Sequence, residues 1–356
     1  MCPQKFTTDA AGYVCLYTFQ RKLTTRKRES EAMMHSRRSA YREQATTQRP
    51  TTWTEAAVLP MPLRRPVTRW LSAFARAAYQ TMSPTAVREF FRELDASDPL
   101  LSRLGWALLL AVPMFAAMAF FASSAPGVAG GLNPWIKPIK FSLSFSTFAS
   151  TMSLLLLALR IPNWQLKLAR RTMAVSIVLE IFSLACQAWR SSYAPGAHTI
   201  VDRVFAQMTS SMVMVNTAIV CLMFVLFCAN RVHVKLVDAP MVSAIRLSLV
   251  IFLAGNAIGG YMLARGSHTV DAADGGPGLP FLNWSTTGGD LRIAHFIAIH
   301  AIQIVPLFAY IISQMAPIPT VKQRRFAIGV VALVVAIAVG GTFVQAALGH
   351  PLLAIH

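Results

Sequence analysis

Residues 289–314 decide the fold, and they read GDLRIAHFIAIHAIQIVPLFAYIISQ. This stretch is long and apolar enough to cross a bilayer, because a hydrocarbon core of about 30 Å takes about 20 helical residues. At about 100° per residue, its polar side chains fall within an arc of roughly 140°. They are Arg292, His295, His300, Gln303, Tyr310 and Gln314. Lipid cannot satisfy such a stripe, so it must face protein or water, and we expect the other helices to form the wall around it.

The composition of the whole chain is that of a membrane protein. Of its 356 residues, 54% are hydrophobic and 13% are charged, and the mean hydropathy is +0.49. Soluble domains carry about 25% charged residues. The apolar runs predict an all-α, seven-transmembrane helical bundle. The expected spans are about 104–122, 137–159, 168–190, 204–229, 241–264, 290–314 and 325–348.

The charge distribution predicts how the bundle lies in the membrane. The net charge is +18, with 33 Lys and Arg against 15 Asp and Glu. These bases lie in the N-terminal tail and in the loops after spans two, four and six, which is typical of the cytoplasmic side of membrane proteins. The arrangement predicts that the N-terminus lies inside and the C-terminus outside (N-in/C-out), and it argues against a nucleic-acid partner. Lys137 and Lys140 break this pattern, since they start span two on the predicted outer side without acids.

Three regions are expected along the chain. Residues 1–81 are basic, lack sustained apolar periodicity and predict a disordered tail. Residues 82–103 predict an amphipathic juxtamembrane segment, and residues 104–350 the transmembrane domain. The five cysteines form no CxxC pair, so neither a disulfide framework nor a zinc ribbon is expected. No cofactor is predicted.

Polar side chains of several spans reach the same depth. At 1.5 Å per residue, Glu180 and His300 each lie about 15 Å inside the outer end of their spans. Glu180 is the one acid predicted within the hydrocarbon, so we expect it to be protonated, or paired with His300, Lys140 or an arginine. The candidate binding residues are Lys140, Glu180, Gln187, Arg190, Asn216, Asn256, Arg292, His295, His300 and Gln303. The alternative is a structural clamp of interhelical hydrogen bonds, each contributing about 0.6–2 kcal/mol.

Three motifs carry a resemblance to a known family. They are NPWIKPIKF at 133–141, QAWR at 187–190, and GDLRIAHF at 289–296 followed by His300 and Gln303. They resemble a family of uncharacterised bacterial multi-pass membrane proteins, over about residues 100–350. The resemblance implies a multi-pass protein of the bacterial cytoplasmic membrane and assigns no reaction.

Function remains open between classes. The polar layer favours binding or transport of a small solute or proton, and an enzymatic role is not expected. The expected partner is the lipid bilayer, and a homo-oligomer is left open. A metal-dependent membrane hydrolase is the second class, because seven spans with histidines near one face are similar to the adiponectin-receptor and alkaline-ceramidase group. Its ligand pool would be His198, His295, His300 and His350 with Asp202 or Asp290. That group's paired HxxxH is absent. The remaining alternative is a haem-binding protein, but the sequence shows no second histidine at the depth of His300 that would serve as the other axial ligand.

The topology is testable with reporter fusions. The alternation of basic loops predicts that fusions after residues 165, 235 and 320 report the cytoplasm, whereas fusions after residues 270 and 356 report the outside. An even number of spans, seen as the same location at both ends of the bundle, would contradict this prediction.

Overall fold

The computed structural model describes residues 64–125, 133–193, 199–234, 236–315 and 319–354. The chain divides into two compact units, Met1–Ser97 and Asp98–His356. In the first unit, helix α2 spans Arg64–Thr81 and helix α3 spans Pro84–Ser97. The prediction of disorder is therefore wrong for residues 64–81, where an Ala- and Arg-rich sequence favours a helix over the expected coil. Residues 1–63 of that predicted tail lie outside the described residues.

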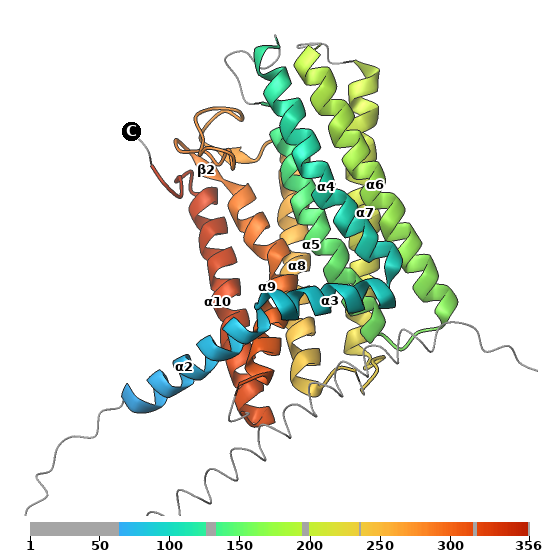
Figure 1. The fold of residues 1–356 in the computed structure, drawn as a ribbon. Coiled ribbons are helices and arrows are strands. Elements are labelled where there is room, and N and C mark those ends of the chain that lie inside the picture. The colour runs from blue at the N-terminus through green and yellow to red at the C-terminus, as the bar shows by residue number, and fades with distance from the viewer. Residues whose placement is uncertain (1–63, 126–132, 194–198, 235, 316–318, 355–356) are drawn as a thin grey trace, which may run out of the picture. The chain divides into compact units, whose positions relative to one another are not determined.

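Within the described residues, the second unit is a bundle of seven membrane-length helices, as the sequence predicts (Figure 1). They are α4 (Pro99–Phe121), α5 (Ile136–Ala158), α6 (Asn163–Tyr193), α7 (Ile200–Cys228), α8 (Ala239–Arg265), α9 (Leu291–Ser313) and α10 (Val321–Ala347). A 3-10 turn, Ala122–Ser124, follows α4. Two short strands, β1 (Thr269–Val270) and β2 (Gly289–Asp290), pair antiparallel between α8 and α9. The chain is thus an integral membrane protein by length and composition of its helices.

Side-chain caps set where several helices begin. An aspartate or threonine just before the helix accepts a hydrogen bond from a backbone N–H that has no partner in the first turn. Two of these caps also join helices, because each carboxylate pairs with an arginine of another helix. Asp98 before α4 pairs with Arg170 of α6 at 2.8 Å, and Asp238 before α8 pairs with Arg324 of α10 at 2.5 Å. The other capped helices are α7 at Thr199, α9 at Asp290 and α10 at Thr320.

Successive helices run in opposite directions, so their connections alternate between the two ends of the bundle (Figure 1). The strands, the α4–α5, α6–α7 and α8–α9 connections and the C-terminus share one end, which we call the β-strand end. Helices α8, α9 and α10 pack on one another, and α4, α5 and α6 do the same. Helix α7 lies between α6 and α8, and α5 touches α9, which joins the two groups.

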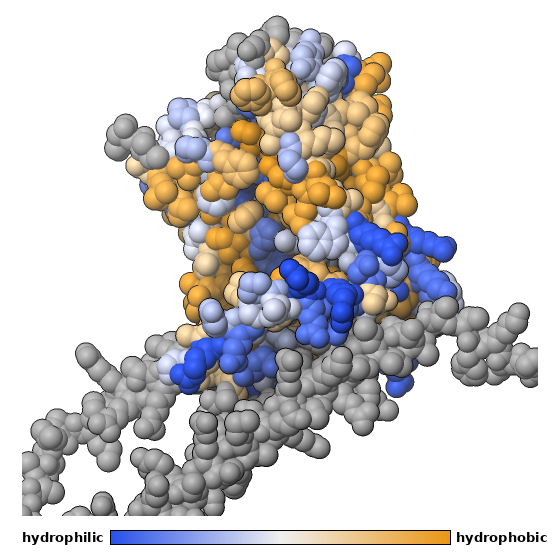
Figure 2. All heavy atoms as spheres, in the orientation of Figure 1, coloured by the Kyte–Doolittle hydropathy of each residue, from blue (hydrophilic) through white to orange (hydrophobic). Residues whose placement is uncertain are grey.

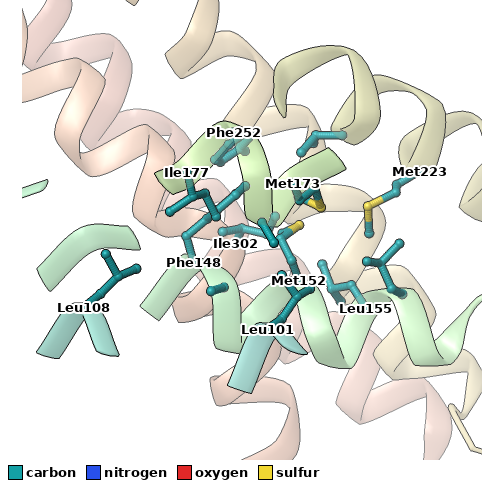
Figure 3. Close-up of a cluster of buried hydrophobic side chains, with 14 of the residues drawn as sticks. Leu101, Leu108, Phe148, Met152, Leu155, Met173, Ile177, Met223, Phe252 and Ile302 are labelled. Atoms are coloured by element: carbon teal, nitrogen blue, oxygen red, sulfur yellow. The ribbon is translucent and has the colours of Figure 1, made fainter. Parts of the chain in front are cut away.

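The core between these helices is apolar. Figure 3 shows Leu101, Met152, Ile177, Met223, Phe252 and Ile302 meeting there, one each from α4 to α9. Hydrophobic side chains also cover much of the bundle surface in view (Figure 2). A soluble protein rarely exposes such a surface over a large contiguous area, whereas a lipid-facing helix bundle needs it. The core and the surface therefore both fit a membrane environment.

Close backbone packing joins α8 to α9. A Cβ atom placed on Gly255 would lie 2.7 Å from the Cβ of Ala298, and one placed on Gly259 would lie 3.0 Å from the His295 ring. The Gly255–Gly259 pair therefore works as a packing motif, which lets the two helices approach. By contrast, Gly260 on the same helix has no atom within 4 Å of its Cβ position.

This difference predicts opposite outcomes for two identical changes. Gly255→Ala should lower the free energy of unfolding by about 1–3 kcal/mol, because the added methyl overpacks the α8–α9 contact. Gly260→Ala is the matched control, and it should cause no loss, since alanine favours a helix over glycine by about 0.5–1 kcal/mol. The measurement is reversible unfolding of the purified protein in detergent. Equal effects of the two changes would show that α8 and α9 are not packed this closely.

Candidate functional site

The contact between α6 and α7 is a polar seam. Three residues of α6, Ser176, Ser183 and Arg190, are spaced seven apart, and so are three residues of α7, Asn216, Thr209 and Asp202. Seven residues are about two helical turns, so each set lies along one face of its helix. The helices are antiparallel, which brings the two sets together in three layers. We call these residues, with Glu180 and Gln187, the α6–α7 seam.

The deepest layer of the seam holds the Glu180 carboxyl group. The Asn216 amide donates a hydrogen bond to Glu180 Oε1 at 2.9 Å, and the Ser176 hydroxyl donates to Asn216 Oδ1 at 2.7 Å. All three side chains are buried, and Glu180 has no exposed surface. Glu180 Oε2 is buried as well, and it has no hydrogen-bond partner among the described residues. One oxygen of the carboxyl group is therefore satisfied and the other is not.

The next two layers lead from Glu180 to the β-strand end. Gln187 Nε2 lies 3.2 Å from the Ser183 and Thr209 hydroxyls, which are 2.8 Å from each other. Beyond them, the Arg190 guanidinium pairs with the Asp202 carboxylate at 2.5 Å and donates to the Thr199 hydroxyl at 2.8 Å. The seam thus runs from a buried acid to a half-buried ion pair near the end of the bundle.

Asn256 of α8 joins this region indirectly. The Thr217 hydroxyl donates to Asn256 Oδ1 at 3.1 Å, and Asn256 Nδ2 donates to the Phe252 carbonyl. Thr217 follows Asn216 directly, and adjacent residues of a helix point about 100° apart. Helix α7 is therefore tied by hydrogen bonds to α6 on one side and to α8 on the other.

The predicted residues of α9 form a separate group. His295 Nδ1 lies 2.7 Å from the Gly255 carbonyl oxygen of α8. The His300 ring packs edge-on to Phe296, with 4.5 Å between ring centroids, and lies beside Gln303. The structure does not bring Glu180 and His300 together, since no hydrogen bond or ion pair joins them in the described part of the chain. The sequence predicts Glu180 and His300 at the same depth, but depth does not determine which helices are neighbours. Helix α6 packs on α7, whereas α9 packs on α8 and α10.

Lys140 and Arg292 belong to a third group, at the β-strand end. Lys140 Nζ donates to the Leu282 carbonyl at 3.1 Å. Arg292 pairs with Asp290 at 2.6 Å and also donates to the Asn283 carbonyl. Neither cation contacts Glu180. The ten predicted residues are therefore distributed over three places instead of one.

The ligand pool of the hydrolase alternative is not assembled. No three His, Cys, Asp or Glu side chains of the described residues come together in a way that could hold a metal ion. Asp202 is engaged by Arg190 and Asp290 by Arg292. His198 lies outside the described residues. Nothing in the described geometry favours a hydrolase over the other classes.

Of the seam residues, Glu180, Gln187 and Arg190 of α6 and Asn216 of α7 were predicted from the sequence as binding candidates. Asp202 was predicted only as a possible metal ligand. The remaining seam residues, Ser176 and Ser183 of α6 and Thr209 of α7, were missed. On α7, the seven-residue spacing of Asp202, Thr209 and Asn216 was the available signal. It was obscured because α7 also carries polar residues on its other faces, including Gln207, Ser210 and Ser211.

No protein-family model, curated protein or solved structure matches this chain. The resemblance of residues 100–350 to uncharacterised bacterial membrane proteins stays a prediction, and so does the bacterial cytoplasmic membrane. The coarser statement is confirmed, because the seven long apolar helices in the described part of the chain make this a multi-pass membrane protein.

The loop between α8 and α9 holds its own charged pair. Burial acts to raise the pKa of Asp274, but hydrogen bonds from Thr269 and Ser267 outweigh it and hold that pKa at about 2. His268 Nδ1 lies 3.3 Å from Asp274 Oδ1. Burial, and next the positive charge of Arg292, nevertheless lower the pKa of His268 below its usual 6.5. His268 is therefore neutral in the folded protein at neutral pH.

A neutral, half-buried His268 predicts a loss of stability in mild acid. The unfolded chain binds a proton at His268 near pH 6.5, whereas the folded chain binds it only at lower pH, so the free energy of unfolding falls as pH drops below about 6.5. His268→Gln should remove this part of the dependence. The measurement is the thermal midpoint of both proteins in detergent at pH 7.5 and pH 5.5. An identical acid shift in both would mean that His268 does not titrate with unfolding.

Proposed function

We propose that this chain is a proton-linked membrane transport protein, in which Glu180 is the proton-binding group. One observation carries the proposal. A carboxyl group without exposed surface lies in the middle of a membrane-spanning helix, and one of its oxygens has no partner among the described residues. Ionisable groups at such depth are rare in membrane proteins, and they commonly mark proton or substrate pathways.

The surroundings of Glu180 suit a group that binds and releases a proton. A buried carboxylate without a cation partner is costly, so the resting group carries a proton. The proton resides on Oε2, because Oε1 accepts the hydrogen bond from Asn216. Asn216 can hold this bond in either protonation state, and Ser176 fixes the orientation of the Asn216 amide by donating to its oxygen.

The seam places hydroxyl and amide groups between Glu180 and the β-strand end. On that side lie the side chains of Ser183, Gln187 and Thr209, whose hydroxyl and amide groups can each donate and accept hydrogen bonds. On the other side of Glu180, the Ser176 hydroxyl is buried beside Met173 and Ile177, which are apolar and fully buried. Polar groups between a buried acid and one end of the bundle fit a binding site that a transporter opens to each side in turn by moving helices.

The competing interpretation is that the seam only holds α6 to α7. Interhelical hydrogen bonds of this type stabilise membrane proteins by about 0.6–2 kcal/mol each. A clamp needs no ionisable group, because glutamine at position 180 could make the same bond to Asn216. The two interpretations therefore differ in what Glu180→Gln does.

The test has two measurements on one set of variants. Infrared spectra of the purified protein at pH 7 should show the C=O stretch of a protonated carboxyl group, which shifts in D₂O and is lost in Glu180→Gln. In vesicles that contain the protein and a trapped pH dye, an imposed potential should drive proton entry. Glu180→Gln should reduce that entry to the rate of empty vesicles, whereas Glu89→Gln, the same chemical change outside the bundle unit, should not.

The result that would overturn the proposal is also specific. If Glu180→Gln keeps both the infrared band and the proton flux of the wild type, Glu180 is not the proton-binding group. If the variant keeps its thermal stability and wild-type vesicles are no more permeable to protons than empty ones at any pH tested, the seam is a structural clamp.

A further inference from the structure

Three cationic side chains gather at the β-strand end, in a place separate from Glu180. Lys137 and Lys140 lie in the first turn of α5 and just after it, and Arg292 lies in the first turn of α9. Lys140 and Arg292 donate to neighbouring backbone carbonyls, those of Leu282 and Asn283. Lys137 and Arg292 both lie close enough to Lys140 to act on its charge.

The negative charge nearby does not balance these cations. Asp290 is the acid that acts on Lys140, but both of its oxygens are already engaged by the Arg292 guanidinium. The Asp274 carboxylate is engaged elsewhere, since it accepts hydrogen bonds from Thr269 and Ser267. The Lys137 ammonium has no hydrogen bond or ion pair within the described ranges, and it is exposed at the end of the bundle.

The position of Lys137 and Lys140 at the start of α5 makes the excess of positive charge larger. The N-terminal end of a helix carries a partial positive charge, so lysines in its first turns are unfavourable and an anion there is favourable. These lysines also stand on the side that the positive-inside pattern predicts to be poor in bases. An anionic ligand at this place would offset both the unfavourable position of the lysines at a helix N-terminus and their presence on the side expected to be poor in bases.

Besides the Asp290 carboxylate, which pairs with Arg292, the acceptors of Lys140 and Arg292 are backbone carbonyls. Leu282 and Asn283 form the tip of a hairpin-like loop, which a bridge between Gly278 and Ser285 closes. Their carbonyl oxygens are neutral acceptors. Hydrogen bonds from a cation to an anionic oxygen are shorter and roughly twice as strong as those between neutral groups. An anion would therefore compete well with these carbonyls for the two cations.

We propose that Lys137, Lys140 and Arg292 bind a phosphate group at the β-strand end. A phosphate offers several anionic oxygens, so it can accept from two ammonium groups and a guanidinium at once, which a carboxylate does less completely. The group can belong to a soluble solute or to a lipid headgroup, because both present the same chemistry at the membrane surface. The site does not depend on Glu180 acting as a proton-binding group.

The test uses the full chain purified in detergent. Inorganic phosphate is titrated at constant ionic strength, balanced with sodium chloride, and the thermal midpoint is followed by tryptophan fluorescence. A second arm compares lipid nanodiscs of phosphatidylglycerol with nanodiscs of phosphatidylcholine. Lys137→Gln is the test variant, since its ammonium makes no contact that the fold needs. Lys167→Gln is the matched control, because Lys167 is exposed at the start of α6, at the opposite end of the bundle.

Binding to the site predicts that phosphate or phosphatidylglycerol raises the midpoint of the wild type and of Lys167→Gln to the same extent. Lys137→Gln should need about tenfold more phosphate for the same shift, which corresponds to the loss of one charge-assisted hydrogen bond. A response to phosphate identifies a soluble ligand, and a response to phosphatidylglycerol alone identifies a lipid headgroup. The proposal is overturned if neither probe raises the midpoint, or if Lys137→Gln responds as the wild type does.

Discussion

The hydrogen bond from Asn216 to Glu180 is the interaction on which the bundle's interior depends. In the hydrocarbon region no water is present to satisfy a polar group, so each buried donor or acceptor needs a partner within the protein. Rotating α7 about its axis by one residue would turn Asn216 by about 100° and leave Glu180 and Ser176 without it. The same rotation would separate Thr217 from Asn256 on α8. A single orientation of α7 therefore satisfies its hydrogen bonds to both α6 and α8, and these bonds fix the rotation of α7 about its axis.

The sequence predicts the spans well because each is set by local composition. Boundaries shifted by up to about five residues, for instance where α4 begins at Pro99 and not at residue 104, since Asp98 caps the helix and pairs with Arg170. The site was predicted less well. Rise per residue gives the depth of Glu180 and of His300, but depth does not say which helix each one faces. That depends on the order in which helices pack, and a single sequence with no internal repeat carries little information on it.

The polar groups that the sequence predicts near mid-bilayer and above it lie in three separate places in this bundle. Along α6 and α7 they form three layers, and the deepest layer holds a buried acid. Against α8, His295 instead occupies the space beside Gly255 and Gly259, so its polarity serves close packing. At the β-strand end, Lys140 and Arg292 hold the α8–α9 loop and face an excess of positive charge. The same residue types thus have different roles at different depths, because only the side chains buried in the hydrocarbon region lack water as a hydrogen-bond partner.

The central claim is that Glu180 interacts with Asn216 and is independent of His300. Two double-mutant cycles on the free energy of unfolding test it most directly, with alanine at positions 180, 216 and 300. The seam predicts an interaction energy of about 0.5–3 kcal/mol between positions 180 and 216. Positions 180 and 300 should be additive within about 0.5 kcal/mol. Additive effects in the first cycle together with a clear interaction in the second would contradict the account, since they would place Glu180 against α9 and not against α7.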